Sequence, residues 1–314
     1  GKLDYSQIDF SKYHSKDMDN WYNPTNKPIE CVVPIIASRS CPHDCSFCCI
    51  HSMLGPSNTY RYRNPDDVFE EIKYLYYEKN IHYFQVIDDC STCHRSKALQ
   101  LFQKLAESEM KISLDFVNGL NIMSLDDSMM DAIVSAGMIR GGLAIESGSD
   151  YLRNTIIGKK LPKEKILSVC NRFKEKYPNV FINAFFILGL PEETTETLDE
   201  TMKLIEELDM VYPVLNIASP FPGSRLWDQC VRDNLLLFDH NDIWKKTLVV
   251  GQTEWSNAKG WTMKGLTPVA DSYCIKPYNL ELEVLDTYHK KLQNIALLRL
   301  NKIKNSLKKY NNPK

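Results

Sequence analysis

Apolar runs of strand length alternate with segments of helical periodicity along most of the chain, from residue 31 to about residue 232. The run VFINAFFILGL (180–190) is almost continuously apolar, as expected for a parallel strand buried on both faces. In NPDDVFEEIKYLYYEKN (64–80), Val68 and Ile72 belong to an apolar series at helical spacing, behind two aspartates that favour a helix N-terminus. The pattern therefore predicts successive βα units.

The alternation predicts six such units, and hence an α/β fold with a parallel sheet that curves into a complete or partial barrel. Ligands of such sheets bind at the carboxyl ends of the strands. The predicted strands are 31–38, 82–88, 112–117, 139–146, 180–190 and 213–218. The predicted helices are 64–80, 96–110, 124–137 (with Ser124 as its N-cap), 149–157, 162–176, 192–209 and 223–231.

The pattern divides the chain into three parts. Residues 1–30 are predicted to be an N-terminal extension or linker, and residues 31–232 the barrel. Residues 233–314 lose the alternation and then form a long helix, so we expect an α-rich C-terminal extension that covers the substrate side. The helix is basic from Lys290 onward, and we expect it to pack through an apolar face that includes Leu298.

Composition narrows the class of protein. Apolar residues make up 43% and charged residues 25% of the 314-residue chain, as in ordinary globular proteins. A net charge of −2 predicts no strong attraction to nucleic acid or acidic membranes. We find neither a signal peptide nor an apolar run of about eighteen residues. Ten cysteines without a secretory signal favour a cytoplasmic protein whose thiols bind metal or do chemistry.

The stretch CPHDCSFCCIH carries the densest set of soft ligands, with Cys41, Cys45 and Cys48 at C-x3-C-x2-C spacing directly after the first predicted strand. Thiolates are the usual ligands of iron–sulfur clusters, and a four-iron cluster held by three cysteines leaves one iron open. The alternatives are zinc bound by the same cysteines and His51, or a disulfide. The fourth cysteine, Cys49, falls outside the pattern.

The segment SRSCPHDCSFC (38–48), including the aromatic Phe47, resembles the signature of the radical S-adenosylmethionine (radical SAM) superfamily. The resemblance implies that the three cysteines hold one 4Fe–4S cluster and that S-adenosylmethionine chelates its open iron. It further implies reductive cleavage of S-adenosylmethionine to a 5′-deoxyadenosyl radical, which abstracts a hydrogen atom from the substrate.

Two later segments extend the resemblance to the cofactor site. FQVIDDCS is similar to the second-strand motif, which implies that Asp88 and Asp89 recognise the methionyl amino group; the alternative is a carboxylate that caps the next helix. LAIESGSDYL resembles the fourth-strand segment, which implies that Glu146 and Ser147 reach the ribose hydroxyls or the methionyl group.

The remaining resemblances concern the fifth and sixth units. FFILGLPEET is similar to the segment in which the backbone of Gly189 and Leu190 approaches the adenine, and SPFPGSRLW (219–227) to one that borders cofactor and substrate. Lys159 matches a position where relatives often carry a basic residue for the cofactor carboxylate, and its alternative is a solvated lysine.

The order of these motifs resembles the branch that contains cobalamin-dependent radical enzymes and their cobalamin-free relatives. DYSQIDFSKY (4–13) resembles the linker behind a cobalamin-binding domain, but no Asp-x-His-x-x-Gly loop occurs in the chain. We therefore favour a compact enzyme without cobalamin over one whose cobalamin domain lies outside this chain. RNA-modifying methylthiotransferases are disfavoured because a pI near 6.4 gives no basic footprint for nucleic acid.

Four further cysteines bear on the reaction. Cys90 and Cys93 form C-x2-C after the second predicted strand, and a redox couple, metal ligands and inert thiols all remain open for them. Cys230 and Cys274 are candidate hydrogen donors of an epimerase-type reaction, although isolated cysteines are commonly small buried hydrophobic residues.

Together these observations predict a cytoplasmic radical SAM enzyme on a partial (βα)6 TIM-like barrel. We expect hydrogen abstraction from a small-molecule or peptide substrate, leading to epimerisation, dehydration or oxidation, with a flavodoxin- or ferredoxin-type electron donor and no membrane partner. The alternatives are a cobalamin-dependent radical C-methyltransferase core without its cobalamin domain, or a non-catalytic, metal-stabilised binding protein.

Overall fold

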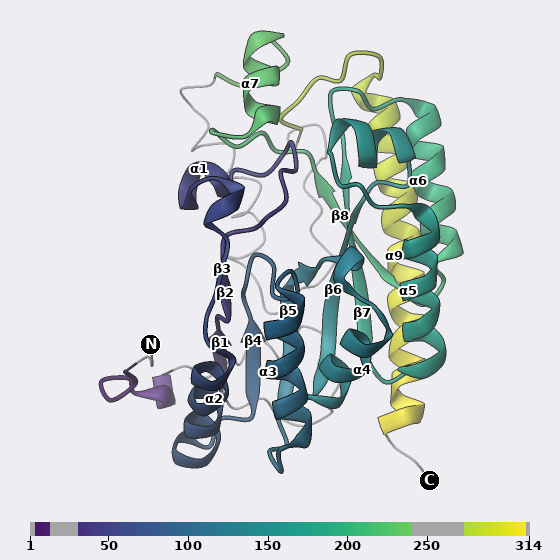
Figure 1. The fold of residues 1–314 in the computed structure, drawn as a ribbon. Coiled ribbons are helices and arrows are strands. Elements are labelled where there is room, and N and C mark those ends of the chain that lie inside the picture. The colour runs from purple at the N-terminus through teal and green to yellow at the C-terminus, as the bar shows by residue number, and fades with distance from the viewer. Residues whose placement is uncertain (1–3, 13–30, 240–272, 312–314) are drawn as a thin grey trace.

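A parallel six-stranded sheet with the order β1-β4-β5-β6-β7-β8 forms the centre of the computed structural model, which describes residues 4–12, 31–239 and 273–311 (Figure 1). Because every neighbouring pair is parallel, each strand is followed by a crossover, as predicted for successive βα units. The strands are β1 (Val32–Ile35), β4 (Tyr83–Val86), β5 (Ser113–Leu120), β6 (Met138–Glu146), β7 (Phe181–Leu188) and β8 (Tyr212–Ile217).

The crossover helices bury their apolar stripes against one face of the sheet, where they share a single large core with the strands. Local signals set their ends: α2 starts with Pro65 behind the cap Asn64, and it stops at Asn80, which is left-handed at φ 55°. The helices are α2 (Pro65–Lys79), α3 (Arg95–Glu107), α4 (Asp127–Ser135), α5 (Lys163–Lys176), α6 (Thr195–Glu207), α7 (Arg225–Arg232) and α9 (Leu282–Asn311).

The α/β fold class and all six predicted βα units are confirmed, with differences at some boundaries. The prediction of Ser124 as the N-cap of the fourth helix is wrong, because Asp126 accepts the hydrogen bond from the Met129 N–H at 2.9 Å and caps α4. The short helix predicted at 149–157 is a π-helix, η4 (Tyr151–Ile156).

Three short elements near the cysteine motif were not predicted. The strands β2 (Ser38–Arg39) and β3 (Arg61–Tyr62) pair antiparallel, and the helix α1 (Ile50–Leu54) lies between them in the chain. Elements of two to five residues carry too little periodicity for sequence patterns to reveal them.

A buried ion pair joins the amino-terminal halves of β5 and β6. Asp115 is fully buried and accepts a 2.8 Å hydrogen bond from Nε of Arg140, which is 4% exposed, and the Nη2 group of Arg140 forms a second bond to the same carboxylate. The Tyr83 hydroxyl donates to Asp115 at 3.0 Å. A charged pair is thus buried near the end of the sheet opposite the cysteine motif.

The C-terminal helix α9 packs beside α6 and the β8 edge of the sheet (Figure 1). Arg299 donates to the carbonyls of Ile205 and Leu208, at 2.5 and 2.8 Å, and so satisfies groups at the end of α6. The predicted contact through Leu298 is wrong: this side chain is 73% exposed, whereas Leu292 and Ile303 are buried.

Part of the extension expected to cover the substrate side (233–314), namely residues 240–272, lies outside the described residues. Among the residues that are described, no helix combines the length and the apolar character needed to cross a bilayer.

Candidate active site

The three motif cysteines lie in one loop between β2 and α1, at the carboxyl end of the sheet; we call residues 40–49 the cluster loop. Cys41 and Cys45 are partly buried and Cys48 is exposed, and none of the three is in a disulfide. The loop therefore offers three thiols on the face where ligands of parallel sheets bind.

Two aspartates at the end of β4 hold the strand-side end of this loop. Buried Asp88 accepts hydrogen bonds from the Ala37 N–H and from the Ser38 hydroxyl, the latter at 2.6 Å. Burial raises the pKa of Asp88, although these donors oppose the rise. Exposed Asp89 accepts a 3.0 Å bond from the Ser40 N–H. Neither aspartate caps the next helix, since α3 has His94 at its N-cap.

Asp88 and Asp89 differ in whether their carboxylates remain available to a ligand. The Asp88 carboxylate is occupied by backbone and side-chain donors of the β1–β2 segment, so this side chain shapes the loop. Asp89 is exposed and lies close enough to Cys41 and Cys48 to raise their pKa values. Binding of the methionyl amino group stays a prediction, and it fits Asp89 better than Asp88.

The other side of the cluster loop is held by the later units of the fold. The Ser46 N–H donates to the Ile157 carbonyl at 3.0 Å, and the Leu226 N–H donates to the Ser46 carbonyl at 2.9 Å. These bonds connect the loop to the end of η4 and to the first turn of α7. Arg225 adds an ion pair with Asp44. Backbone of η4 and α7, together with the aspartate side chains after β4, thus holds the loop that carries the cysteines.

The chemistry of this donor set fits a bound metal cluster. Burial raises the pKa of all three thiols, that of Cys45 to about 11, and the thiols raise each other's pKa further. The cation that acts on all of them is Lys159. Gathered thiols of this kind become thiolates when a metal supplies the compensating charge. Cys41, Cys45 and Cys48 would hold the iron–sulfur cluster.

The zinc alternative required His51 as a fourth ligand, and the structure uses this side chain otherwise. His51 Nε2 lies 2.9 Å from the Cys41 carbonyl, and Nδ1 lies 3.7 Å from the Asp44 carboxylate. Cys49 turns toward α1, where its sulfur is 3.8 Å from that of Met53. Both ring nitrogens of His51 thus face oxygen atoms of the cluster loop. Cys49 contacts Met53, and it also adds to the effect of burial in raising the pKa of Cys48.

Glu146 and Lys159 form an ion pair of 2.8 Å beside the cluster loop. Glu146 ends β6 with φ 74°, a left-handed conformation that is rare for a non-glycine residue and is often found at functional sites. Burial disfavours the charge of Lys159, but Glu146 and the thiols of Cys45 and Cys41 outweigh it and raise the pKa of Lys159. The side chain of Lys159 is only 15% exposed, so Lys159 is not a solvated surface lysine.

Ser147 points elsewhere. Its hydroxyl lies 3.3 Å from the Thr201 hydroxyl of α6 and accepts from the Ser149 N–H at 3.1 Å. Fully buried Arg153 donates to the Ser147 carbonyl at 2.9 Å. The predicted contact of Ser147 with the cofactor is untested, and the structure gives its hydroxyl a part in holding the loop against α6.

The segment that follows β7 contains a buried carboxyl that the sequence did not single out. Gly189 has φ 86°, and its N–H donates to Glu193 at 3.2 Å; the Thr197 hydroxyl donates to the same carboxyl group at 2.7 Å. Glu193 is 1% exposed, and burial raises its pKa to about 7. Glu193 therefore fixes the Gly189–Leu190 backbone, the part predicted to approach adenine. A carboxylate just before the helix cap Thr194 was the signal that could have found it.

Replacing Glu193 with glutamine is expected to change how stability depends on pH. The folded-state pKa of about 7 lies above the ordinary value of 4.5. The contribution of protonated Glu193 is therefore fully present below pH 4.5 and is lost as the pH rises to about 7. Urea unfolding should show that the free energy of unfolding falls less between pH 5 and pH 8 in Glu193→Gln than in wild type. Glu175→Gln, on the exposed face of α5, should keep the wild-type difference; an unchanged difference in Glu193→Gln would contradict the assignment.

Cys230 and Cys274 lie together in a small apolar cluster against which Cys45 and Phe47 also pack. Their side chains are 0% and 1% exposed, and burial raises the pKa of Cys230 to about 12. This environment is that of small buried hydrophobic residues. Their role as hydrogen donors stays a prediction. Phe47 supports the cluster loop from the same apolar cluster.

Comparisons with known proteins agree with this geometry. Residues 35–205, more than half of the chain, match the family described as the Radical SAM superfamily. An uncharacterized methyltransferase from Pyrococcus horikoshii is 29% identical over 65% of this chain and 43% of its own. The cytidylyl-2-hydroxyethylphosphonate methyltransferase of Streptomyces wedmorensis is 26% identical over 75% of this chain and 45% of its own. The chain thus spans less than half the length of these curated relatives.

Among solved structures, the radical S-adenosylmethionine methyltransferase TsrM from Kitasatospora setae, with cobalamin and a [4Fe-4S] cluster bound, superposes with a TM-score of 0.56. The match covers 70% of this chain and 43% of that protein at 14% identity, so it concerns the fold alone. The fold is that of the TIM-like barrels of this superfamily, as predicted.

Proposed function

Because the chain belongs to the radical SAM superfamily of enzymes, we propose that it is the core of a radical S-adenosylmethionine methyltransferase. The observation that carries the proposal is the gathering of three thiols beside the Glu146–Lys159 pair at the carboxyl ends of the strands. Relatives named as methyltransferases support this reading over the epimerisation, dehydration or oxidation that the sequence first suggested.

When bound, the iron–sulfur cluster would supply the electron for reductive cleavage and the open iron that S-adenosylmethionine chelates. Cys41, Cys45 and Cys48 would hold it, and the bonds of Ser46 to η4 and α7 keep the loop that carries the three thiols in place. In this proposal the electron comes from a flavodoxin- or ferredoxin-type donor, and the substrate is a small molecule or peptide.

We assign the cofactor contacts by charge and position. Asp89 accepts hydrogen bonds from the methionyl ammonium group, for which its exposed carboxylate is suited. Lys159 binds the carboxylate of the cofactor and Glu146 its ribose hydroxyls, so that binding replaces their mutual ion pair with ligand contacts. Gly189, held by Glu193, brings backbone close to the adenine without a side chain in the way.

Methyl transfer of this kind also requires a methyl carrier, and we propose that cobalamin is this carrier. The support is the superposition on TsrM, which binds cobalamin, together with the sequence segment 4–13 that resembles a linker behind a cobalamin domain. This replaces our first expectation of a cobalamin-free enzyme.

The test compares products under anaerobic, reducing conditions with and without added cobalamin. We expect about four irons per chain in the reconstituted protein and slow formation of 5′-deoxyadenosine from S-adenosylmethionine. Adding cobalamin should cause S-adenosylhomocysteine to appear. 5′-Deoxyadenosine without S-adenosylhomocysteine would favour the hydrogen-abstraction reading instead. A protein that binds no iron and forms neither product would contradict any radical SAM activity.

A further inference from the structure

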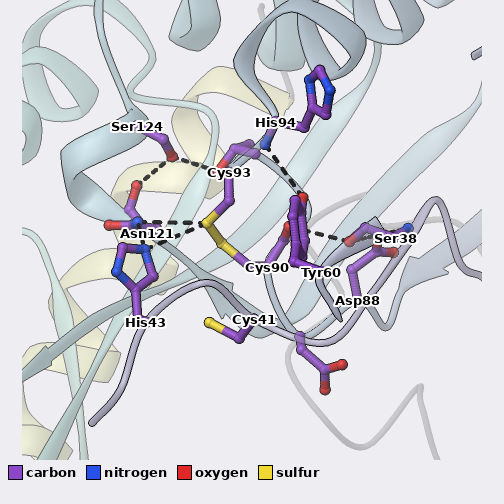
Figure 2. The surroundings of a disulfide bond; sticks show 12 residues. Ser38, Cys41, His43, Tyr60, Asp88, Cys90, Cys93, His94, Asn121 and Ser124 are labelled. Carbon is purple, nitrogen blue, oxygen red and sulfur yellow. Dashed lines mark hydrogen bonds between the residues drawn. A yellow bond between two sulfur atoms is a disulfide. The ribbon is translucent and has the colours of Figure 1, made fainter. Parts of the chain in front are cut away.

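Next to the cluster loop, Cys90, Cys93 and His43 bring three soft ligand atoms together (Figure 2). Their sulfurs and an imidazole nitrogen all lie within 4.8 Å of one another. The two cysteines are joined as a disulfide with a Cα–Cα distance of 5.6 Å, and His43 Nε2 lies 3.5 Å from the Cys93 sulfur. Cys90, Cys93 and His43 are not among the residues proposed to hold the iron–sulfur cluster or S-adenosylmethionine.

The three residues come from two loops that are distant in sequence. Cys90 and Cys93 lie in the turn between β4 and α3, whereas His43 lies in the cluster loop, between Cys41 and Cys45. Two cysteines at C-x2-C spacing form the common half of a zinc site, and histidine is a common further ligand. The convergence of a third ligand on that pair is a property of the fold and is not apparent from either motif alone.

Hydrogen bonds around the group hold it in place, as second-shell contacts do in metal sites (Figure 2). The Cys90 carbonyl accepts from the hydroxyls of Tyr60, at 2.9 Å, and Ser38, at 3.1 Å. The Asn121 amide lies 2.5 Å from His43 Nε2 and 3.6 Å from the Cys93 sulfur, so this amide occupies both ligand atoms in the disulfide form and must turn away from them when zinc binds. Cys90 is 3% exposed, Cys93 is partly buried and His43 is exposed, so a metal ion could reach the group from the His43 side.

The working state of the pair is the dithiol if the proposed function holds. Iron–sulfur clusters can work at potentials far below those at which disulfides of C-x2-C redox pairs are reduced. A donor that can reduce the cluster can therefore also reduce this disulfide, by adding two electrons and two protons to give two thiols. A small-molecule dithiol performs the same reduction by exchange and becomes a cyclic disulfide.

We propose that the reduced Cys90–Cys93 pair and His43 bind one zinc ion. Zinc forms two Zn–S bonds and one Zn–N bond, and the two thiols each release a proton to solvent, so no electrons are transferred in this step. A set of two cysteines and one histidine leaves the fourth tetrahedral position for water. Because His43 belongs to the cluster loop, the ion ties this loop to the end of β4 and acts as a positioning site for the iron–sulfur cluster.

The experiment measures zinc in the cluster-reconstituted protein. The protein is reduced anaerobically with dithiothreitol, loaded with Zn²⁺ and separated from unbound metal by gel filtration. Elemental analysis should then give about one zinc per chain beside about four irons, and X-ray absorption should show Zn–S and Zn–N distances of about 2.3 and 2.0 Å. Cys93→Ser should lose the zinc, whereas Cys49→Ser, in the cluster loop but outside the group, should retain it.

A second variant and a second measurement complete the test. His43→Gln keeps both thiols but removes a ligand, so it should weaken zinc binding by more than the roughly 10- to 100-fold typical of changes beside a ligand, and it should also speed the loss of iron to a chelator. Zinc that is absent from the reduced wild type, or is equal in wild type and Cys93→Ser, would overturn the proposal. Zinc absent from a protein that holds iron and cleaves S-adenosylmethionine defeats only this inference, whereas zinc bound without iron defeats only the proposed function.

Discussion

Replacing Cys45 with alanine is expected to remove the iron–sulfur cluster, and cleavage of S-adenosylmethionine with it, while the sheet stays folded. Cys45 is the motif thiol that interacts electrostatically with both other cysteines and with the Glu146–Lys159 pair. Changes beside a metal ligand already reduce metal affinity about 10- to 100-fold, so loss of a ligand should reduce it further. Iron content after anaerobic reconstitution and 5′-deoxyadenosine formation should both fall to background, and far-ultraviolet circular dichroism should be unchanged.

The matched control is Cys49→Ala, four positions further along the same loop. Its sulfur contacts Met53 on α1 rather than the other thiols, so iron content and 5′-deoxyadenosine formation should stay near the wild-type level. Turnover retained by Cys45→Ala, or equal losses in both variants, would contradict the assignment of Cys41, Cys45 and Cys48 as the ligand set.

The strands and helices could be predicted because burial against a sheet imposes a pattern on single segments. The near-continuous apolar run of β7 is one example, since Ile182, Ala184 and Phe186 face the helices while Asn183 and Phe185 alternate with them. The cysteine motif was equally local, because its ligands fall within eight residues of one turn. Where one segment contains all the information, the sequence is enough.

The contacts between segments could not be predicted. Asp88 and Asp89 are neighbours in sequence, yet one is buried under backbone donors and the other is exposed beside the cysteines. Ser147 similarly joins α6 through Thr201, which lies 54 residues away. Which carboxylate or hydroxyl remains available to a ligand depends on these long-range hydrogen bonds.

The two ends of the barrel also differ in their side chains: a buried ion pair occurs near each end, but the motif thiols lie only at the carboxyl ends of the strands. The carboxyl ends of the strands present Glu146, Asp89 and the cluster loop for binding, and these groups remain only partly satisfied within the protein. At the amino ends, Asp115 and Arg140 satisfy each other through two hydrogen bonds. Stability and function are thus supplied by opposite ends of the same strands, as in other barrels of this kind.

Replacing Asp115 with alanine should destabilise the protein more than any surface change, by about 3–5 kcal/mol. The substitution removes the carboxylate that accepts two hydrogen bonds from Arg140, which is 4% exposed and so cannot recover them from water. It also removes the acceptor of the Tyr83 hydroxyl. Urea unfolding followed by circular dichroism should give a correspondingly lower free energy of unfolding.

Two controls distinguish the stability effect of the buried Asp115–Arg140 pair from that of an ion pair on the surface. Glu207→Ala removes an ion pair with Lys163, whose two side chains are 44% and 45% exposed, and it should cost about 1 kcal/mol or less. The double variant Asp115→Leu with Arg140→Met replaces the buried pair by apolar groups, and it should recover much of the stability lost in Asp115→Ala. If Asp115→Ala costs no more than Glu207→Ala, the buried pair does not stabilise this end of the barrel. If the double variant is less stable than Asp115→Ala, the loss does not arise from the buried charge of Arg140.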